Sequence, residues 1–268
     1  QFEQGGRERA DYGSELLTAL SKDLHTRYGK GFSKSNVYFM RSLYQHYPKF
    51  QTVSGKLSWS HYVLLLGVDD DLEKRFYEQQ CVSDAWSVRE LQRQIDSALF
   101  YRIALSKDKK GVLRLARKGN IVKKAQDIVK DPYVLEFLGI PEAQSYTEKR
   151  LESSIIDNLQ LFLLELGKGF SFVGRQFRMN IGSKHFYVDL VFYHTVLKCY
   201  VLIDLKTGSA SHADVGQMNM YLNYFKNEMH TDSDQEPVGI ILASKKDRIE
   251  VEYALGGMSN QLFVSKYK

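Results

Sequence analysis

The apolar residues of this chain change their spacing near residues 131–150, and this change dictates two kinds of architecture in one sequence. Before it, they recur at helical intervals of three and four residues. After it, short runs rich in Val, Ile, Phe and Tyr alternate with further helical segments. A single type of element cannot satisfy both patterns, because helices and strands repeat their faces at different periods. We therefore expect a basic all-helical domain over 1–130, a connector over 131–148 and an α/β domain over 149–268.

The order of elements in the α/β domain predicts helices packed on a mixed sheet. Helical spacing covers 149–166 and about 212–227, and another helix is expected at about 248–255. The runs with strand character are 170–176, 185–193, 199–206, 238–243 and 261–267. The resulting order, α-β-β-β-α-β-α-β, is typical of an α/β sandwich.

Composition excludes several classes of protein. With 268 residues, of which 43% are hydrophobic, the chain can bury one large core or two ordinary ones. The sequence holds no apolar run of the roughly 18 residues that span a bilayer. Its two cysteines make neither a disulfide framework nor a zinc site, and its paired glycines lack the pattern of a phosphate loop. We expect a cytoplasmic protein without membrane attachment or nucleotide cofactor.

Positive charge is concentrated in residues 102–130, which hold ten Lys and Arg but two acids, Asp108 and Asp127. Such a segment suits a polyanionic partner. Charge alone fits a solvated helical face equally well.

Three ionisable residues interrupt predicted strands whose other residues are apolar: Asp189 in one strand, and Asp204 and Lys206 in the next. Burying an unpaired charge costs several kcal/mol, roughly, so these residues need partners. Side chains alternate along a strand, so Asp204 and Lys206 share a face. A short turn at 194–198 would let the two strands pair and bring Asp189 beside Asp204.

This arrangement predicts a metal-assisted reaction. Two adjacent carboxylates without His or Cys ligands favour Mg²⁺, with Mn²⁺ able to substitute, and Asp189 and Asp204 are the expected ligands. A lysine on the same face can hold a water molecule or stabilise charge on a phosphate. The alternative interpretation is a salt-bridged Asp204–Lys206 pair at a sheet edge.

Four segments of the second region, 165–176, 186–194, 203–208 and 216–222, resemble the YhcG family of PD-(D/E)XK nucleases. Segments of the first region resemble the all-helical N-terminal part of the same family, and these are 31–33, 57–62, 86–91 and 131–138. The resemblance implies a restriction-endonuclease-like core (α-β-β-β-α-β, mixed sheet) in the C-terminal part and a separate all-α N-terminal domain.

The resemblance also implies roles for individual residues. Asp189 matches the first catalytic acid of the family, which binds the metal directly. Asp204 matches the (D/E) position of the motif, and Lys206 matches its lysine.

A glutamine, Gln217, matches a residue that opens the next helix and lies near the metal or phosphate in several branches of the superfamily. The alternative for Gln217 is a plain surface amide. Tyr221 and Tyr224 would face the same way as Gln217, and Tyr221 is a candidate nucleic-acid contact. The adjacent stripe is expected to face the core; it consists of Met218, Leu222 and Phe225.

An acid is also expected on the first core helix, and the sequence offers two. Glu152 begins this helix and Glu165 ends it; we expect Glu152, with Glu165 as the alternative. Arg175 and Gln176, which end the first predicted strand, are candidate phosphate contacts or ordinary surface residues.

The helical region has one segment, 30–41, that suits a helix-turn-helix reader, because a short loop and a Ser N-cap lead into a polar helix opening. Its contacts would be Lys34, Asn36, Tyr38 and Arg41. Arg89 and Arg93, one turn apart, would hold phosphates. A helical dimerisation domain is the competing interpretation.

Together these features predict a Mg²⁺-dependent endonuclease that cleaves DNA in genome maintenance or in defence against foreign DNA. RNA stays open as a substrate, and a homodimer is expected because two strands need two sites. The alternatives are a catalytically silent nucleic-acid-binding module and a helical assembly protein with a nuclease-like domain.

Overall fold

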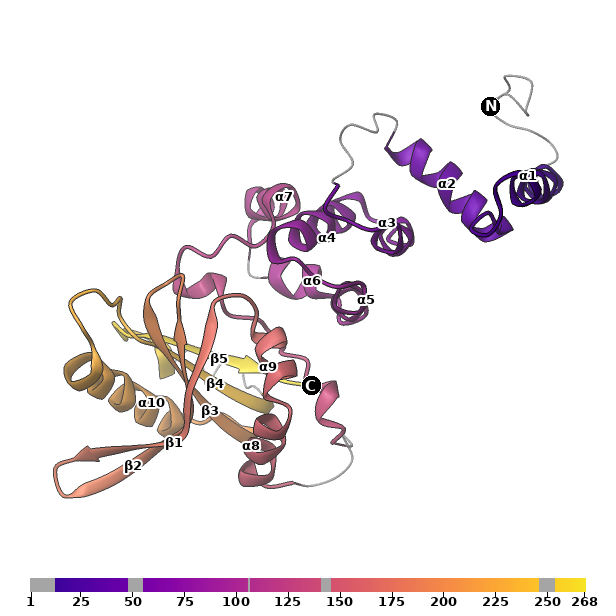
Figure 1. Cartoon of the computed structure of the whole chain (residues 1–268). Helices are drawn as coiled ribbons and strands as arrows, with labels where there is room; N and C mark the ends of the chain where they lie inside the picture. The colour runs from indigo at the N-terminus through magenta and orange to yellow at the C-terminus, as the bar shows by residue number, and fades with distance from the viewer. Residues whose placement is uncertain (1–12, 48–54, 106, 141–145, 246–253) are drawn as a thin grey trace. The chain divides into compact units, whose positions relative to one another are not determined.

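The computed structural model describes residues 13–47, 55–105, 107–140, 146–245 and 254–268. The chain divides into two compact units. The first contains Gln1–Asp96 and Ala116–Gly119, and the second contains Ser97–Leu115 and Asn120–Lys268. The first unit is helical in its described part and the second carries the sheet, as the change of spacing predicts (Figure 1). The expected boundaries at 130 and 148 stay predictions.

Short polar caps define the helices of the first unit. Ser33 accepts a hydrogen bond from the backbone N–H of Asn36 (3.2 Å) and so begins the second helix, as its N-cap pattern predicts. Asp70 caps a later helix in the same way. The helices wholly inside this unit are α1 (Gly13–Tyr28), α2 (Lys34–His46), α3 (Trp59–Leu66), α4 (Asp71–Asp84) and α5 (Val88–Asp96). Helices α6 (Leu99–Ala104) and α7 (Lys109–Lys118) follow.

The second unit is built on a five-stranded sheet of order β1-β2-β3-β4-β5. The strands are β1 (Phe170–Ile181), β2 (Lys184–His194), β3 (Cys199–Ser209), β4 (Val238–Lys245) and β5 (Gln261–Lys266). The pairs β1–β2 and β2–β3 are antiparallel, whereas β3–β4 and β4–β5 are parallel. The predicted mixed sheet is therefore confirmed. Because β3 is the central strand, Asp204 and Lys206 do not lie at a sheet edge.

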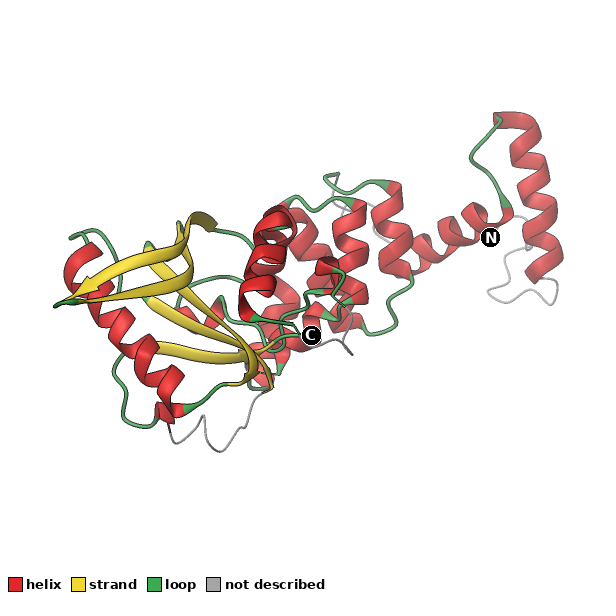
Figure 2. Ribbon diagram, turned by 90° about the horizontal axis from the view of Figure 1, so that it is seen from below, coloured by secondary structure: helices red, strands yellow, loops and turns green. Residues whose placement is uncertain are grey.

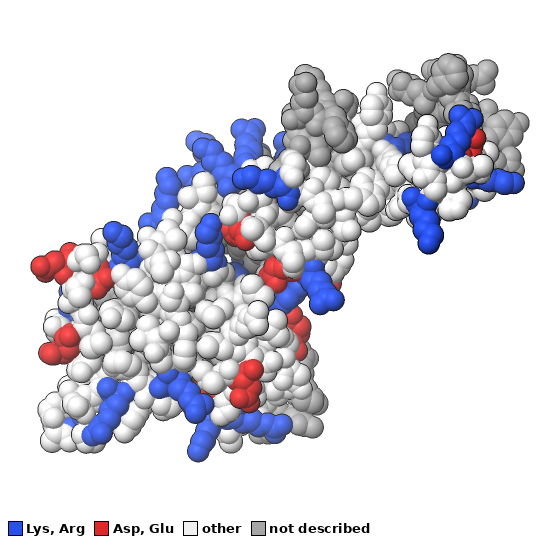
Figure 3. All heavy atoms as spheres, viewed as in Figure 1, with Lys and Arg blue, Asp and Glu red and all other residues white. Residues whose placement is uncertain are grey.

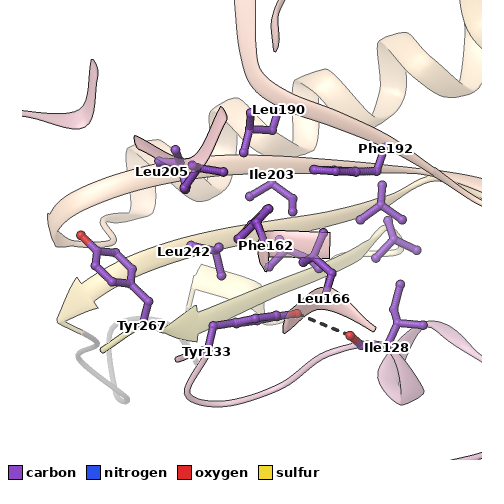
Figure 4. Packing of buried hydrophobic residues seen from close by; sticks show 14 of the residues in the cluster. Ile128, Tyr133, Phe162, Leu166, Leu190, Phe192, Ile203, Leu205, Leu242 and Tyr267 are labelled. Atoms are coloured by element: carbon purple, nitrogen blue, oxygen red, sulfur yellow. Dashed lines mark hydrogen bonds between the residues drawn. The ribbon is translucent and has the colours of Figure 1, made fainter. Parts of the chain in front are cut away.

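Helices cover both faces of this sheet (Figure 2). On one face, α8 (Glu148–Asp157) and α9 (Leu159–Leu166) pack with residues 125–138 against apolar side chains of β2, β3 and β4. Figure 4 shows Phe162 and Leu166 close to Ile203 and Leu242. On the other face lies α10 (His212–Tyr224), which a π-helical turn (Phe225–Met229) extends. The predicted stripe of Met218, Leu222 and Phe225 is buried there, as expected.

The expected single helix at 149–166 is wrong, because Asn158 divides it into α8 and α9. The backbone N–H of Asn158 bonds back to α8, and its side-chain amide donates to the carbonyl of Ser154 (3.0 Å). An asparagine that bonds local backbone in this way competes with continued helix. The expected helix at 212–227 likewise ends three residues early and gives way to the π-helical turn.

Strand β1 runs five residues beyond its expected end at 176. Residues 177–181 pair with β2 across a tight turn in which Gly182 adopts the left-handed conformation (φ 59°). The expected helix at 248–255 falls almost wholly on residues 246–253, outside the described part of the chain. Among the described helices, none combines the length and the apolar character needed to cross a membrane.

Candidate active site

Two carboxylates lie where β2 and β3 stop pairing. The ladder ends with Leu190 opposite Ile203, so Asp189 and Asp204 are the next residues on each strand. Instead of a backbone pair, the carboxylate Oδ2 of Asp189 accepts the backbone N–H of Leu205 at 2.8 Å. The two acids therefore lie side by side, as the sequence predicts.

The surroundings of Asp204 make its negative charge costly. The residue is 6% exposed. Burial raises the pKa of this carboxyl, the neighbouring Asp189 raises it further, and Lys206 opposes both, so the pKa stands at about 7. Burial and the neighbouring acid thus both disfavour a charged carboxylate at Asp204.

Lys206 lies among three carboxylates. Its Nζ is 2.9 Å from Asp204, 3.5 Å from Asp214 on α10 and 3.8 Å from Glu148 on α8. Burial alone would lower the pKa of Lys206, but these carboxylates, Asp204 foremost, raise it above its ordinary value. The side chain is therefore an ammonium at neutral pH.

Sequence reasoning missed Glu148 and Asp214. Asp214 lies three residues after Ser211 and forms a capping box with it at the start of α10. The capping-box spacing is visible in the sequence, but it indicates the start of a helix and not a contact with Lys206. For Glu148, which is one of several acids near a helix start, we find no distinguishing signal in the sequence.

The structure brings one of the two candidate helix acids to this site. Glu152 of α8 is 7% exposed, and its Oε2 accepts a hydrogen bond from Gln176 Nε2 at 2.7 Å. The same Nε2 donates to Oδ1 of Asp189 at 3.0 Å. Gln176 of β1 therefore links Glu152 to the carboxylate pair.

The other candidate, Glu165, lies elsewhere in the second unit. It ends α9 beside the start of β1, where Phe170 pairs with His194 and His194 pairs with Cys199. Cys199 and Asp204 are five residues apart on β3, a separation of about 17 Å along a strand. Glu165 is fully buried and forms an ion pair with Arg102 (Nη1–Oε1 2.6 Å).

On α10, Gln217 is exposed and its side-chain amide contacts the hydroxyl of Tyr221. Tyr221 is 1% exposed, because its ring packs in the core beneath α10. Burial, together with the nearby Asp204 carboxylate, raises the pKa of Tyr221. The prediction that Tyr221 contacts nucleic acid is thus corrected, because its ring is buried in the core and its hydroxyl contacts Gln217.

The other residues predicted to contact nucleic acid differ in how far their side chains are exposed. Arg175 is exposed beside the site, opposite Leu190. In the first unit Lys34 and Arg89 are exposed and Arg41 is half-buried. The amide of Asn36 donates to the carbonyl of Gly31 (2.9 Å) and so orders the loop before α2. Arg93 is half-buried, 3.9 Å from the carboxylate of Glu90. Their contacts with nucleic acid stay predictions.

The sequence of this chain matches known protein families along most of its length. The family model of the YhcG PDDEXK nuclease domain matches residues 126–268, and that of the DUF1016 N-terminal domain matches residues 1–102. The chain is 39% identical over 300 residues to the nuclease candidate YhcG of Escherichia coli (strain K12), with 100% of this chain and 80% of that relative covered.

Solved structures with partial likeness include a repair endonuclease and a protein–DNA complex. A repair endonuclease from Pyrococcus abyssi gives a TM-score of 0.33 at 21% identity, covering 47% of this chain and 49% of its own. A complex of EndoMS with double-stranded DNA gives 0.34 at 18% identity, covering 47% and 48%. The matches thus span about half the length of each of these structures.

The second unit therefore carries a nuclease domain of the PD-(D/E)XK class. The chain as a whole belongs to the YhcG nuclease family, which confirms the resemblance seen in the sequence.

Proposed function

We propose that the protein is a metal-dependent endonuclease that hydrolyses phosphodiester bonds in DNA. The observation that carries this proposal is the pairing of Asp189 with Asp204 beside the ammonium of Lys206, in the central region of the sheet. It is supported by membership of a nuclease family.

The donor set of the site fits a hard divalent cation. Asp189 and Asp204 offer carboxylate oxygens. Burial first and the neighbouring Asp189 second raise the pKa of Asp204, and a cation between the two acids would offset both effects. In the described part of the chain, no three His, Cys, Asp or Glu side chains form a metal-binding group. A site with two protein carboxylates suits Mg²⁺, which retains water ligands and also binds substrate phosphates, and Mn²⁺ would substitute. When bound, the cation would polarise the phosphate oxygens.

Lys206 contributes a fixed positive charge at the same place. An ammonium that is already oriented can stabilise the charge that develops on a phosphate without further rearrangement. Glu148 and Asp214 contact the Nζ from the two helices that flank the strand, so they help to hold it beside Asp204.

Exposed positive charge supports a polyanionic substrate. In the second unit, Arg102, Lys107 and Lys130 contact groups within the fold. Residues 102–115 and 120–130 are the parts of the basic segment that belong to this unit. Five other basic side chains are exposed there, and these are Lys109, Lys110, Arg114, Lys123 and Lys124. Figure 3 shows Lys and Arg side chains gathered over α7. This surface suits nucleic-acid phosphates, DNA above all, and RNA stays open. We further propose that the protein acts in genome maintenance or in defence against foreign DNA. We also propose that it forms a homodimer with one active site for each strand.

The test is a cleavage assay on duplex, branched and single-stranded DNA and on RNA, with Mg²⁺, Mn²⁺ or EDTA. We expect wild type to cut at least one DNA form with either metal and to be inactive in EDTA. Asp204→Ala and Lys206→Ala should each reduce the rate by about a thousandfold or more, since each removes a group that acts in the transition state. Lys226→Ala is the matched control, because this lysine forms an exposed ion pair with Glu236 away from the site (2.7 Å).

Equal cutting by wild type and both site variants would identify a contaminating nuclease. Binding of nucleic acid in EDTA, with no cleavage of any substrate after metal addition, would replace the proposal by a silent binding module.

A further inference from the structure

Gln176 has an unusual backbone at the point where β1 passes the carboxylates. Its φ of 45° lies in the left-handed region, which a residue with a Cβ rarely adopts inside a strand. The residues on either side remain paired with β2, Arg175 opposite Leu190 and Phe177 opposite Val188. Between these two pairs, the distortion falls at the one position opposite Asp189. Strain of this kind persists where surrounding contacts enforce it, and it is concentrated at functional sites.

With this backbone conformation, the side-chain amide of Gln176 contacts two carboxylates. Its Nε2 donates to Glu152 Oε2 at 2.7 Å and to Asp189 Oδ1 at 3.0 Å. An amide nitrogen carries two hydrogens, so one is directed to each carboxylate. If the amide were rotated by 180°, its oxygen would face two carboxylates and be repelled by both. This repulsion fixes the orientation in which the Nε2 group faces the acids.

These contacts argue against the expectation that Gln176 binds phosphate. Both N–H groups are already occupied by acids, and the remaining amide oxygen would repel a phosphate.

Asp189 receives one hydrogen bond on each carboxylate oxygen. Gln176 of β1 donates to Oδ1, and the backbone N–H of Leu205 in β3 donates to Oδ2. Its carboxylate plane is thus fixed from both neighbouring strands.

We propose that Gln176 is a positioning residue that couples Glu152 of α8 to Asp189, so that Glu152 acts on the metal site through this amide. The inference rests on the proposed function for the identity of the reaction. Groups that orient metal ligands in this way change metal affinity or activity by about 10- to 100-fold when they are removed.

The first test needs no metal and measures unfolding temperature in EDTA at pH 8. Gln176→Glu keeps the shape but puts a third carboxylate between two acids, so this variant should unfold at a lower temperature than Gln176→Ala. Adding Glu152→Gln to Gln176→Glu should recover part of the loss, because one of the repelling charges is removed. A Gln176→Glu protein as stable as wild type would overturn the inference.

The second test measures Mn²⁺ affinity by calorimetry. Gln176→Ala should bind Mn²⁺ about 10- to 100-fold more weakly than wild type. Glu152→Ala should do the same, and the double variant should be no weaker than either single one, because the two residues act in series. Arg178→Ala, an exposed residue of β1 that contacts His185 away from the carboxylates, should bind Mn²⁺ as wild type does.

Wild-type affinity in Gln176→Ala, or additive losses in the double variant, would contradict the proposed coupling. If wild type itself binds no Mn²⁺, the metal dependence under the proposed function fails, and the unfolding series in EDTA then decides on the coupling alone.

Discussion

Asp204→Asn is expected to abolish cleavage and yet leave the metal-free protein at least as stable as wild type. Asparagine occupies the same volume but carries no charge. It therefore removes the proposed metal ligand together with a buried negative charge that burial and Asp189 disfavour. Loss of activity with retained stability separates a functional carboxylate from a structural one.

The measurement is the unfolding temperature in EDTA and after addition of Mn²⁺, with cleavage rates alongside. Wild type should gain stability from Mn²⁺ because the cation binds the folded state alone, whereas Asp204→Asn should gain little. Asp232→Asn, an exposed acid on the loop before β4, should behave as wild type. An Asp204→Asn protein that unfolds well below wild type in EDTA would assign this carboxylate to the fold and not to a metal site.

Glu165→Gln is expected to produce a large loss of stability, roughly 3–5 kcal/mol at neutral pH. The carboxylate is fully buried and accepts hydrogen bonds from Arg102 (2.6 Å) and from the backbone N–H of Val134 (3.0 Å). Lys130 donates to the backbone carbonyl of the same residue. A neutral amide would leave the buried guanidinium without its counter-ion.

The same ion pair predicts a pH dependence. Burial alone would raise the pKa of Glu165, but Lys130 and Arg102 outweigh it, so the pKa lies below its ordinary value of 4.5. An acid with a lowered pKa stabilises the folded state above its unfolded pKa, and that contribution is lost as pH falls through the folded pKa. Wild type should therefore lose stability as the pH drops below about 4.5, and Glu165→Gln should lack this component.

Denaturant unfolding between pH 3 and pH 8 measures both effects, with the exposed Glu228→Gln as control. Arg102→Met combined with Glu165→Leu should recover much of the loss, since both buried charges are then absent. Below its unfolding temperature Glu165→Gln should still cleave DNA at the wild-type rate, whereas Glu152→Gln should cleave about 10- to 100-fold more slowly. The reverse result would make Glu165 the helix acid.

The sequence predicted the carboxylate pair because the physical signal is local. A charged residue inside an apolar strand needs a partner, and the alternation of the strand placed Asp204 and Lys206 on one face. The stripe of Met218, Leu222 and Phe225 was predicted for the same reason, because helical spacing fixes which residues share a face.

The rest depends on contacts that no spacing encodes. The choice between Glu152 and Glu165 assumed one continuous helix, and the break at Asn158 resets the helical phase between them. The conformation of Gln176 is enforced by groups on α8 and β2, so its own sequence neighbourhood cannot reveal it.

The ion pair of Glu165 also means that the family match and the compact unit begin at different residues of the chain. The nuclease family match begins at residue 126, yet Arg102 lies before that point and contacts both Glu165 and the carbonyl of Pro132. A fragment cut at residue 126 would lack Arg102 and would keep Lys130 as the remaining cation near this buried acid. We expect an autonomous nuclease fragment to begin at or before Ser97, whose carbonyl and hydroxyl complete the contacts of Arg102.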